Sequence, residues 1–377
     1  MNDVLSLTQK LISRISVTPD DAGCQRLVAE RLAAAGFEVE WFYCGAVSNV
    51  LLTHGDGSPS MWFLGHTDVV PPGPEEDWSS PPFAPEVRDG VLYGRGAADM
   101  KGAVAAMVVA LQEFAIAHSS HRGQAGLLLT SDEEGIAQDG VRVVAEILGQ
   151  RGLAPDYCLV GEPSSQKEFG DTVRIGRRGS INARLLVDGI QGHTAYPHSL
   201  DNPVHRLAPF LAELLSTAWD EGDENFPPSH CQVSNFSAGT GAENVTPGHA
   251  ALMFNFRNAP QSSADDLRDR VEKMLKRHDV GSYELQWRVS GEPFRSEAGA
   301  LREALRDVLE GQLGMQADMN TGGGTSDARF MAPLGTEVLE FGLLNESIHK
   351  VDECASVKDL DRLARIYSSL LKKLLPS

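Results

Sequence analysis

The sequence predicts an α/β protein, in which a mostly parallel or mixed sheet is covered by helices and a small α+β domain is inserted near the middle. Short apolar runs alternate with helical patterns through the first half of the 377 residues, which is typical of strands joined by covering helices. Between residues 179 and 292 the order becomes β-α-β-β-α-β, the ferredoxin-like order. From residue 293 the first pattern returns, so we expect the inserted domain to interrupt a discontinuous one.

The discontinuous domain is expected to comprise residues 1–178 and 293–377. It begins with an amphipathic helix within residues 1–20, without the basic and apolar regions of a signal peptide. The apolar residues at helical spacing are Val4, Leu5, Leu7, Leu11, Ile12 and Ile15. Strands are predicted from short apolar runs, at Met61–Leu64, Gly126–Thr130, Tyr157–Val160 and Glu337–Phe341. Further helices are predicted from apolar periodicity, at Leu27–Ala35, Lys101–His118, Val141–Leu148, Leu301–Leu313 and Val357–Leu374.

The inserted domain is expected to span residues 179–292. Its strands are predicted at Ile181–Val187, Val233–Ser237, Ala251–Arg257 and Tyr283–Val289. Its two helices are predicted at Pro203–Ala218 and Asp265–His278. A unit of this order can form a small domain with a core of its own.

The charge of the chain limits its partners. It carries 33 basic and 52 acidic residues, a formal net charge of −19, which argues against nucleic acid or an anionic membrane. No stretch approaches the roughly 18 apolar residues of a membrane-spanning helix. Five scattered cysteines without a C-x-x-C pair are typical of reduced thiols, so we expect a cytoplasmic protein.

Histidines and carboxylates follow the predicted strands of the discontinuous domain. The segments after strands are Gly65-His66-Thr67-Asp68, Ser131-Asp132-Glu133-Glu134-Gly135, Gly161-Glu162-Pro163 and Ile348-His349-Lys350. A further one, Ala97-Ala98-Asp99-Met100-Lys101, stands directly before a predicted helix. In an open α/β sheet, ligands bind at the carboxyl ends of the strands. We therefore expect these side chains to meet at one edge.

Imidazole combined with several carboxylates suits zinc or a neighbouring transition metal. So many carboxylates in one place would repel one another unless cations neutralised them, and a shared carboxylate can bridge two ions roughly 3.5–4 Å apart. Taken singly, each motif has a plainer interpretation: Asp99 as a helix N-cap, Glu133-Glu134 as a solvated turn, His349 as a loop histidine. Their joint occurrence at strand ends favours a metal centre.

These segments, together with Gly94-Arg95-Gly96 before Ala97, resemble the metal motifs of the aminoacylase/carboxypeptidase-type co-catalytic zinc peptidases, and the resemblance spans nearly the whole chain. It implies a zinc-peptidase-like catalytic domain with two Zn²⁺ ions, Co²⁺ being possible in one or both sites. The implied ligands are His66 and Glu162 for one ion and Glu134 and His349 for the other, with Asp99 bridging both. It also implies that Asp68 hydrogen-bonds His66 and that Glu133 is the general base.

The same resemblance implies that the inserted domain is a lid and a dimerisation domain of a homodimer. His193, in Gly192-His193-Thr194-Ala195-Tyr196-Pro197, would then stabilise the oxyanion across the dimer interface. As an isolated segment, this would more often be an ordinary turn with a histidine.

Further segments are Gly176-Arg177-Arg178-Gly179-Ser180, Gly192-His193-Thr194-Ala195-Tyr196-Pro197-His198, Asp201-Asn202-Pro203, Phe254-Asn255-Phe256-Arg257, Gly322-Gly323-Gly324-Thr325-Ser326-Asp327 and Glu340-Phe341-Gly342. They are similar to segments of family members that remove succinate from N-succinyl-LL-2,6-diaminopimelate in lysine biosynthesis. The resemblance implies a small anionic N-acyl amino acid as substrate, contacted by Arg178, Tyr196, Asn244, Arg257, Gly324, Thr325 and Asn345. Arginines can pair with carboxylates in a bidentate manner, although a single arginine is more often a surface ion-pair partner. We expect the Gly322–Thr325 loop to open a helix whose N–H groups face an anion.

Two alternative interpretations stay open. One is an acetylornithine deacetylase, an aminoacylase or a di- or tripeptidase with the same metal site. The other is a metal-binding module without turnover, against which Glu133 argues, because a binding protein needs no base beside its ligands. The sequence has no G-x-S-x-G elbow, no H-E-x-x-H helix and no P-loop, so it lacks the signatures of the hydrolases and nucleotidases that use them.

Overall fold

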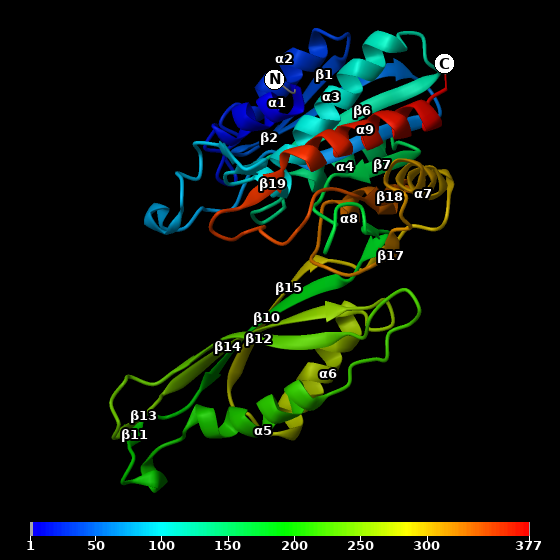
Figure 1. Cartoon of the computed structure of the whole chain (residues 1–377). Coiled ribbons are helices and arrows are strands. Elements are labelled where there is room, and N and C mark those ends of the chain that lie inside the picture. The colour runs from blue at the N-terminus through cyan, green and yellow to red at the C-terminus, as the bar shows by residue number, and fades with distance from the viewer. Residues whose placement is uncertain (1–2, 377) are drawn as a thin grey trace. The chain divides into compact units, whose positions relative to one another are not determined.

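The structure, a computed structural model, describes residues 3–376. The chain folds into two compact units, both drawn in Figure 1. The first comprises the described residues up to Gly176, Arg295–Asn320 and those from Ser326 on, and the second comprises Arg177–Phe294 with Thr321–Thr325. Residues 1, 2 and 377, which belong to the predicted catalytic domain, lie outside the described part of the chain.

The first unit is built on a mixed eight-stranded sheet in the order β1-β2-β6-β3-β7-β18-β8-β17. The strands are β1 (Glu38–Cys44), β2 (Val47–Asp56), β3 (Ser60–His66), β6 (Gly123–Thr130), β7 (Tyr157–Val160), β8 (Thr172–Arg174), β17 (Asp318–Asn320) and β18 (Glu337–Glu340). Strands β6, β3, β7 and β18 lie side by side and parallel. Their carboxyl ends therefore share one edge. The predicted mixed sheet covered by helices is confirmed.

Helices cover both faces of this sheet. Those that share one large apolar cluster are α1 (Asp3–Ile12), α2 (Cys24–Ala33), α3 (Gly102–Ala117), α7 (Ala300–Leu313) and α9 (Val357–Leu374). Helices α3 and α9 lie side by side, in cyan and red in Figure 1. Helices α4 (Val141–Arg151) and α8 (Ala328–Met331) contact each other and bury their apolar residues outside that cluster. They pack on the other face.

One expectation for the helices is wrong. Helix α1 ends at Ile12, so Ile15 is not part of its buried face and is 60% exposed. The segment Ala97–Ala117 is long and apolar enough to cross a membrane by length and composition alone. Because 78% of its apolar window is buried inside the protein, the apolarity is that of a core helix packed on all sides.

The second unit contains the predicted ferredoxin-like order. Its elements are β10 (Gly179–Asp188), α5 (Pro203–Ser216), β12 (His230–Ala238), β14 (His249–Asn258), α6 (Ala264–Arg277) and β15 (Tyr283–Gly291). The four strands form an antiparallel sheet in the order β12-β14-β10-β15. Alternate residues of β14, such as Leu252, Phe254 and Phe256, are buried in an apolar cluster with α5 and α6. This unit therefore has its own core.

Short strands complete the two units. They are β4 (Glu86–Arg88), β5 (Val91–Tyr93) and β19 (Cys354–Ser356) in one sheet, β11 (Gly192–His193) and β13 (Val245–Thr246) in another, and β9 (Gly176–Arg177) with β16 (Phe294–Arg295) in a third.

Candidate metal centre

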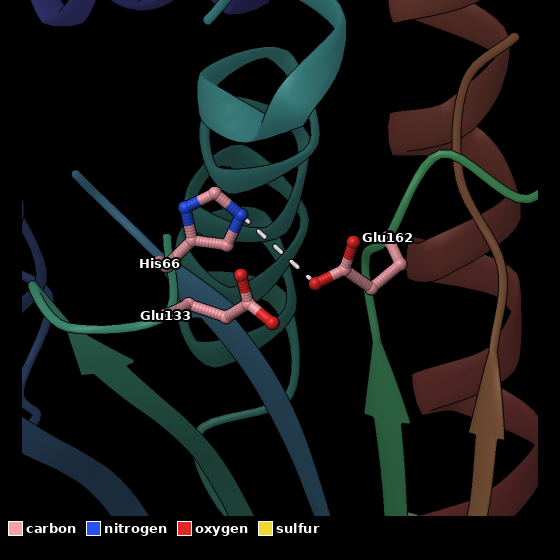
Figure 2. Close-up of side chains that lie close together, drawn as sticks. All are labelled: His66, Glu133 and Glu162. Atoms are coloured by element: carbon pink, nitrogen blue, oxygen red, sulfur yellow. Dashed lines mark ion pairs between the residues drawn. The ribbon is translucent and has the colours of Figure 1, made fainter. Parts of the chain in front are cut away.

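Three neighbouring parallel strands of the first unit position the centre. His66 is the last residue of β3, Glu133 follows β6 and Glu162 follows β7. Figure 2 shows the three side chains turned toward one another, with His66 and Glu162 joined by an ion pair. Because the strands are adjacent and parallel, polar residues far apart in sequence meet at one edge of the sheet.

The predicted ligands converge. Two sets of side chains, His66 with Glu133 and Glu162, and His66 with Asp99 and Glu134, each offer ligand atoms within 4.8 Å of one another. His349 joins the second set: its Nε2 lies 3.1 Å from Glu134 Oε1 and 3.3 Å from Asp99 Oδ2.

The two carboxylate oxygens of Asp99 face different histidines. Oδ1 lies 3.2 Å from His66 Nε2, whereas Oδ2 lies 3.3 Å from His349 Nε2. Two ligands of a tetrahedral zinc ion, each roughly 2.0–2.2 Å from it, are about 3.3 Å apart. The donor set and its spacing therefore fit one divalent ion between each histidine and the Asp99 oxygen that it faces.

The histidines and Asp99 shift one another's pKa. Burial alone would lower the pKa of His66, but Asp99 and Asp68 raise it well above its usual value. Burial alone would raise the pKa of Asp99, but hydrogen bonds from His349 and His66 bring it far below its usual value. Hydrogen bonds to Asp99 and Glu134 raise the pKa of His349 to about 10. The cluster favours positive charge beside its carboxylates, and a bound metal ion would supply that charge in place of the protons.

Glu133 lies in a different environment. Burial raises its pKa well above the usual value, and the charges of Glu162 and Asp327 raise it further. A carboxylate with a raised pKa holds a proton more readily than a free carboxylate does. This is the property that a general base for hydrolysis needs.

Asp68 is fully buried and contacts His66 through its main chain. His66 Nδ1 donates to the Asp68 backbone oxygen at 2.9 Å, whereas the carboxylate Oδ1 is 3.7 Å away. The carboxylate accepts the backbone N–H of Glu134 at 3.1 Å instead. The main chain of Asp68 therefore orients the imidazole, and its side chain holds the turn that carries Glu133 and Glu134.

Most of the predicted substrate-binding residues belong to the second unit, where they form two groups. In the first group, Arg178 Nη1 lies 3.1 Å from His230 Nδ1. Strand pairing places His230 directly opposite Arg257. Burial and these two arginines lower the pKa of His230. Two guanidinium groups thus surround a neutral imidazole, which gives this part of the second unit a local positive charge.

The second group contains His193, Tyr196 and Asn244. The rings of His193 and Tyr196 meet edge to face at 5.5 Å, and the Thr194 N–H donates to the Asn244 backbone oxygen at 3.1 Å. His193, Tyr196 and Asn244 are exposed. Asn345, in the first unit, lies in the same loop as His349, and its N–H donates to the Ser165 oxygen at 3.0 Å.

The prediction that the Gly322–Thr325 loop opens a helix is wrong. Thr321–Thr325 groups with the second unit, and α8 begins only at Ala328, after an N-cap at Asp327. Helix α8 contains a single turn, so it presents no sizeable positive end to an anion at Gly324 or Thr325. Ser326 and Asp327, which separate the loop from the helix, are buried, and Ser326 Oγ donates to Glu340.

Sequence reasoning assigned no role to Arg95, Asp327 and Glu353, although all three are buried. Glu353 accepts hydrogen bonds from the Arg95 side chain and from the N–H of Asp99. Arg95 and Asp327 stand inside strings that carry the family resemblance, and Glu353 follows His349 by four positions. That proximity to recognised motifs was the available signal.

Comparison with known proteins places the chain in a family. The model of peptidase family M20/M25/M40 matches residues 62–373. The succinyl-diaminopimelate desuccinylase of Xanthomonas campestris pv. campestris (strain 8004) is 55% identical over 374 residues, which cover 99% of each chain. Among solved structures, an M20 family metallo-carboxypeptidase from Sulfolobus solfataricus has a TM-score of 0.85 at 16% identity, covering 99% of each chain.

A dinuclear metal binding peptidase of the M20 family from Bacillus subtilis has a TM-score of 0.73 at 13% identity, covering 97% of this chain and 96% of that one. These two likenesses show that the fold is shared. The family model matches most of the chain and the Xanthomonas relative matches nearly all of it, and so the chain belongs to peptidase family M20/M25/M40.

Proposed function

We propose that the chain hydrolyses N-succinyl-LL-2,6-diaminopimelate to succinate and LL-2,6-diaminopimelate, using two metal ions held at the edge of the large sheet. The observation that carries the substrate assignment is the 55% identity, over 99% of both chains, to a succinyl-diaminopimelate desuccinylase. The convergence of two histidines and four carboxylates supports the chemistry.

Five residues of the centre are assigned to metal binding and one to proton transfer. His66 and Glu162 would hold one ion, Glu134 and His349 the other, and Asp99 both. Two divalent ions so held would lower the pKa of water and polarise the amide carbonyl. Glu133 takes the proton of the attacking water and passes it to the departing amine nitrogen, a role for which its raised pKa suits it.

Two arginines that lie close to each other in the second unit support the assignment of an anionic substrate. Arg178 and Arg257 flank His230, and each can pair with a carboxylate through two N–H groups. We assign them to the carboxylates of the substrate, with Tyr196, Asn244, Gly324, Thr325 and Asn345 as further contacts.

His193 has the tautomer that an oxyanion donor needs. Its Nδ1 accepts the Ala195 N–H at 3.0 Å, so the neutral ring carries its proton on Nε2. An exposed Nε2–H is free to donate to the oxygen of the cleaved amide. We assign His193 to that role, supplied by the second copy of a homodimer.

The surface of the second unit supports dimerisation. Strand β12 lies at the edge of its sheet, and Phe236 on it and Met253 on the neighbouring strand are 46% and 42% exposed. An exposed apolar edge strand is a ready surface for a second copy. We assign residues 179–292 to a lid and dimerisation domain and residues 1–178 and 293–377 to the catalytic domain. A solution mass of one chain, 40.7 kDa, would contradict the homodimer.

Zinc is the metal that we expect, because the donor set is mixed imidazole and carboxylate and zinc binds such sites more tightly than cobalt. Cobalt in one or both sites stays possible. We place the enzyme in the cytoplasm, an assignment supported by five cysteines that are all free thiols.

A substrate panel tests the assignment. Zinc-loaded protein is assayed with N-succinyl-LL-2,6-diaminopimelate, N-acetylornithine and a set of di- and tripeptides. The succinyl substrate should give the highest kcat/KM. Faster cleavage of N-acetylornithine or of a peptide would overturn the substrate assignment and leave the metal centre in place.

A further inference from the structure

The carboxylate of Glu353 binds four donors around the loop that carries Asp99. Its Oε1 accepts the N–H groups of Ala98 at 2.9 Å and Asp99 at 3.0 Å. Its Oε2 accepts the Gly96 N–H at 2.9 Å and Arg95 Nη1 at 2.7 Å. The Glu353 side chain is 1% exposed. A buried carboxylate is stable only when its oxygens are satisfied in this way.

Arg95 extends the same contact to the loop that carries His349. Its Nη1 also donates to the Lys350 backbone oxygen at 3.2 Å, one residue after His349. The main chain of Glu353 adds a further link, because its oxygen accepts the Gly94 N–H at 2.9 Å. Arg95 and Glu353 therefore join the segment that ends in Asp99 to the segment that begins at His349.

The His349 loop needs such support. His349 and Asp352 have φ angles of 60° and 57°, in the left-handed region that residues other than glycine rarely adopt. Such backbone persists only where its surroundings hold it. His66, by contrast, is the last residue of β3 and is paired with Thr130 of β6, and Glu162 follows the end of β7 by only two residues.

We propose that Arg95 and Glu353 form a buried clamp that sets the separation between Asp99 and His349 and so retains the metal ion of Glu134 and His349. The inference rests on the metal centre of the proposed function, but not on the identity of the substrate. Glu353 is a positioning residue. It accepts the backbone N–H of Asp99, and it contacts Arg95, which in turn holds the loop that carries His349.

Zinc titration of the metal-free chain tests the clamp. In Glu353→Gln an amide NH₂ replaces one oxygen and faces N–H donors, so the clamp is broken while size is kept. The wild-type chain should bind two equivalents of zinc. Because Asp99 is assigned to both ions, Glu353→Gln should weaken both equivalents, but the one held by Glu134 and His349 at least tenfold more than the one held by His66 and Glu162. Arg95→Lys, which replaces the guanidinium group by a single ammonium group, should show the same pattern to a smaller degree. It replaces Glu353→Gln in the test if that variant does not fold.

Glu337→Gln is the matched control. Glu337 also accepts two backbone N–H groups, those of Leu301 and Arg302, at the start of α7. This variant should lose stability without changing the ratio of the two zinc affinities. A further experiment places Glu353→Gln in a His349→Ala chain, where it should weaken the remaining zinc much less than it weakens the zinc held by Glu134 and His349 in the wild-type chain.

The outcomes separate the two proposals. Equal weakening of both zinc equivalents, or no weakening of either, would overturn the clamp alone. A wild-type chain that bound fewer than two equivalents would overturn the two-metal centre and the clamp with it. Two bound equivalents without cleavage of the succinyl substrate would overturn only the substrate assignment.

Discussion

At the residue scale, Glu133 separates catalysis from metal binding. Its carboxylate lies within the cluster around His66 and Glu162, yet in the proposed mechanism it accepts a proton and does not bind a metal ion. Glu133→Gln removes the base and keeps the shape. We expect kcat to fall roughly 10²–10⁴-fold, the range of general-base contributions, with two zinc ions retained by elemental analysis.

Glu146→Gln, on α4 in an exposed i,i+4 ion pair with Arg142, provides the control and should leave kcat unchanged. If Glu133→Gln lost zinc in proportion to activity, Glu133 would be a ligand. If it kept a normal kcat, it would not be the base.

His230 provides a pH test in the second unit. Burial, together with Arg178 and Arg257, lowers its pKa in the fold, whereas an unfolded histidine titrates near a pKa of about 6.5. At and below that pH the unfolded chain binds a proton that the folded chain disfavours, so stability rises with pH. The contribution of the neutral ring is present above about pH 6.5 and is lost as the pH falls below it.

His230→Gln keeps a hydrogen-bond acceptor but does not titrate. We expect the stability of the wild-type chain relative to this variant to fall when urea unfolding is measured at pH 5.5 instead of pH 7.5. A difference that is the same at both pH values would show that His230 titrates alike in the folded and unfolded chains.

At the scale of elements, Gly342 sets how closely two strand ends approach. It follows β18, and a Cβ there would lie 2.5 Å from the backbone oxygen of Glu162 and 2.6 Å from that of Gly161. Gly342→Ala must therefore move the end of β18 away from the end of β7, which carries Glu162. We expect a loss of roughly 1–3 kcal/mol in unfolding free energy, the range for overpacking, and weaker zinc binding.

Gly311→Ala is the opposite case. Gly311 lies within α7, and a Cβ there would meet nothing within 4 Å. Since alanine favours a helix over glycine by roughly 0.5–1 kcal/mol, this variant should be stabilised and should bind zinc normally. Denaturant unfolding and zinc titration of both variants test these two predictions. A Gly342→Ala chain as stable as wild type would show that the strand ends are not tightly packed.

The elements also show what the sequence can predict. The four strands expected in the first unit, β3, β6, β7 and β18, are the adjacent parallel ones, because strands buried on both faces appear as continuous apolar runs. The β1–β2 hairpin was missed, since its first strand is largely exposed and mixes polar with apolar residues. The histidines and carboxylates that converge at the sheet edge could be predicted because strand ends concentrate polar motifs.

Other parts of the site depend on contacts between segments far apart in sequence. Glu353 lies four positions after His349, but its role could not be predicted from that position alone, because its donors, Arg95 and Asp99, lie more than 250 positions away. The Gly322–Thr325 loop was misjudged for a related reason: Ser326, which follows the loop, is buried and donates a hydrogen bond to Glu340, a contact between distant segments that the sequence does not reveal.

At the scale of the whole molecule, the net charge of −19 is unevenly placed. Asp99, Glu133, Glu134 and Glu162 converge at one edge of the first unit, whereas Arg178 and Arg257 lie together in the second. Each unit also has an apolar core of its own. A change confined to the metal centre should therefore act on the first unit much more than on the second.

Removal of the metal tests this division. Without a cation, the carboxylates of the centre repel one another and no ligand stabilises the fold of the first unit. A ligand present at 100 times its Kd stabilises the folded state by roughly 2.7 kcal/mol, so EDTA should lower the Tm of the first unit by several degrees. Scanning calorimetry should show the transition of the second unit unmoved, with zinc-saturated EDTA as the control for ionic effects. If EDTA lowered both transitions equally, the two cores would unfold as one, and if it lowered neither, the cluster of carboxylates would hold no structural metal.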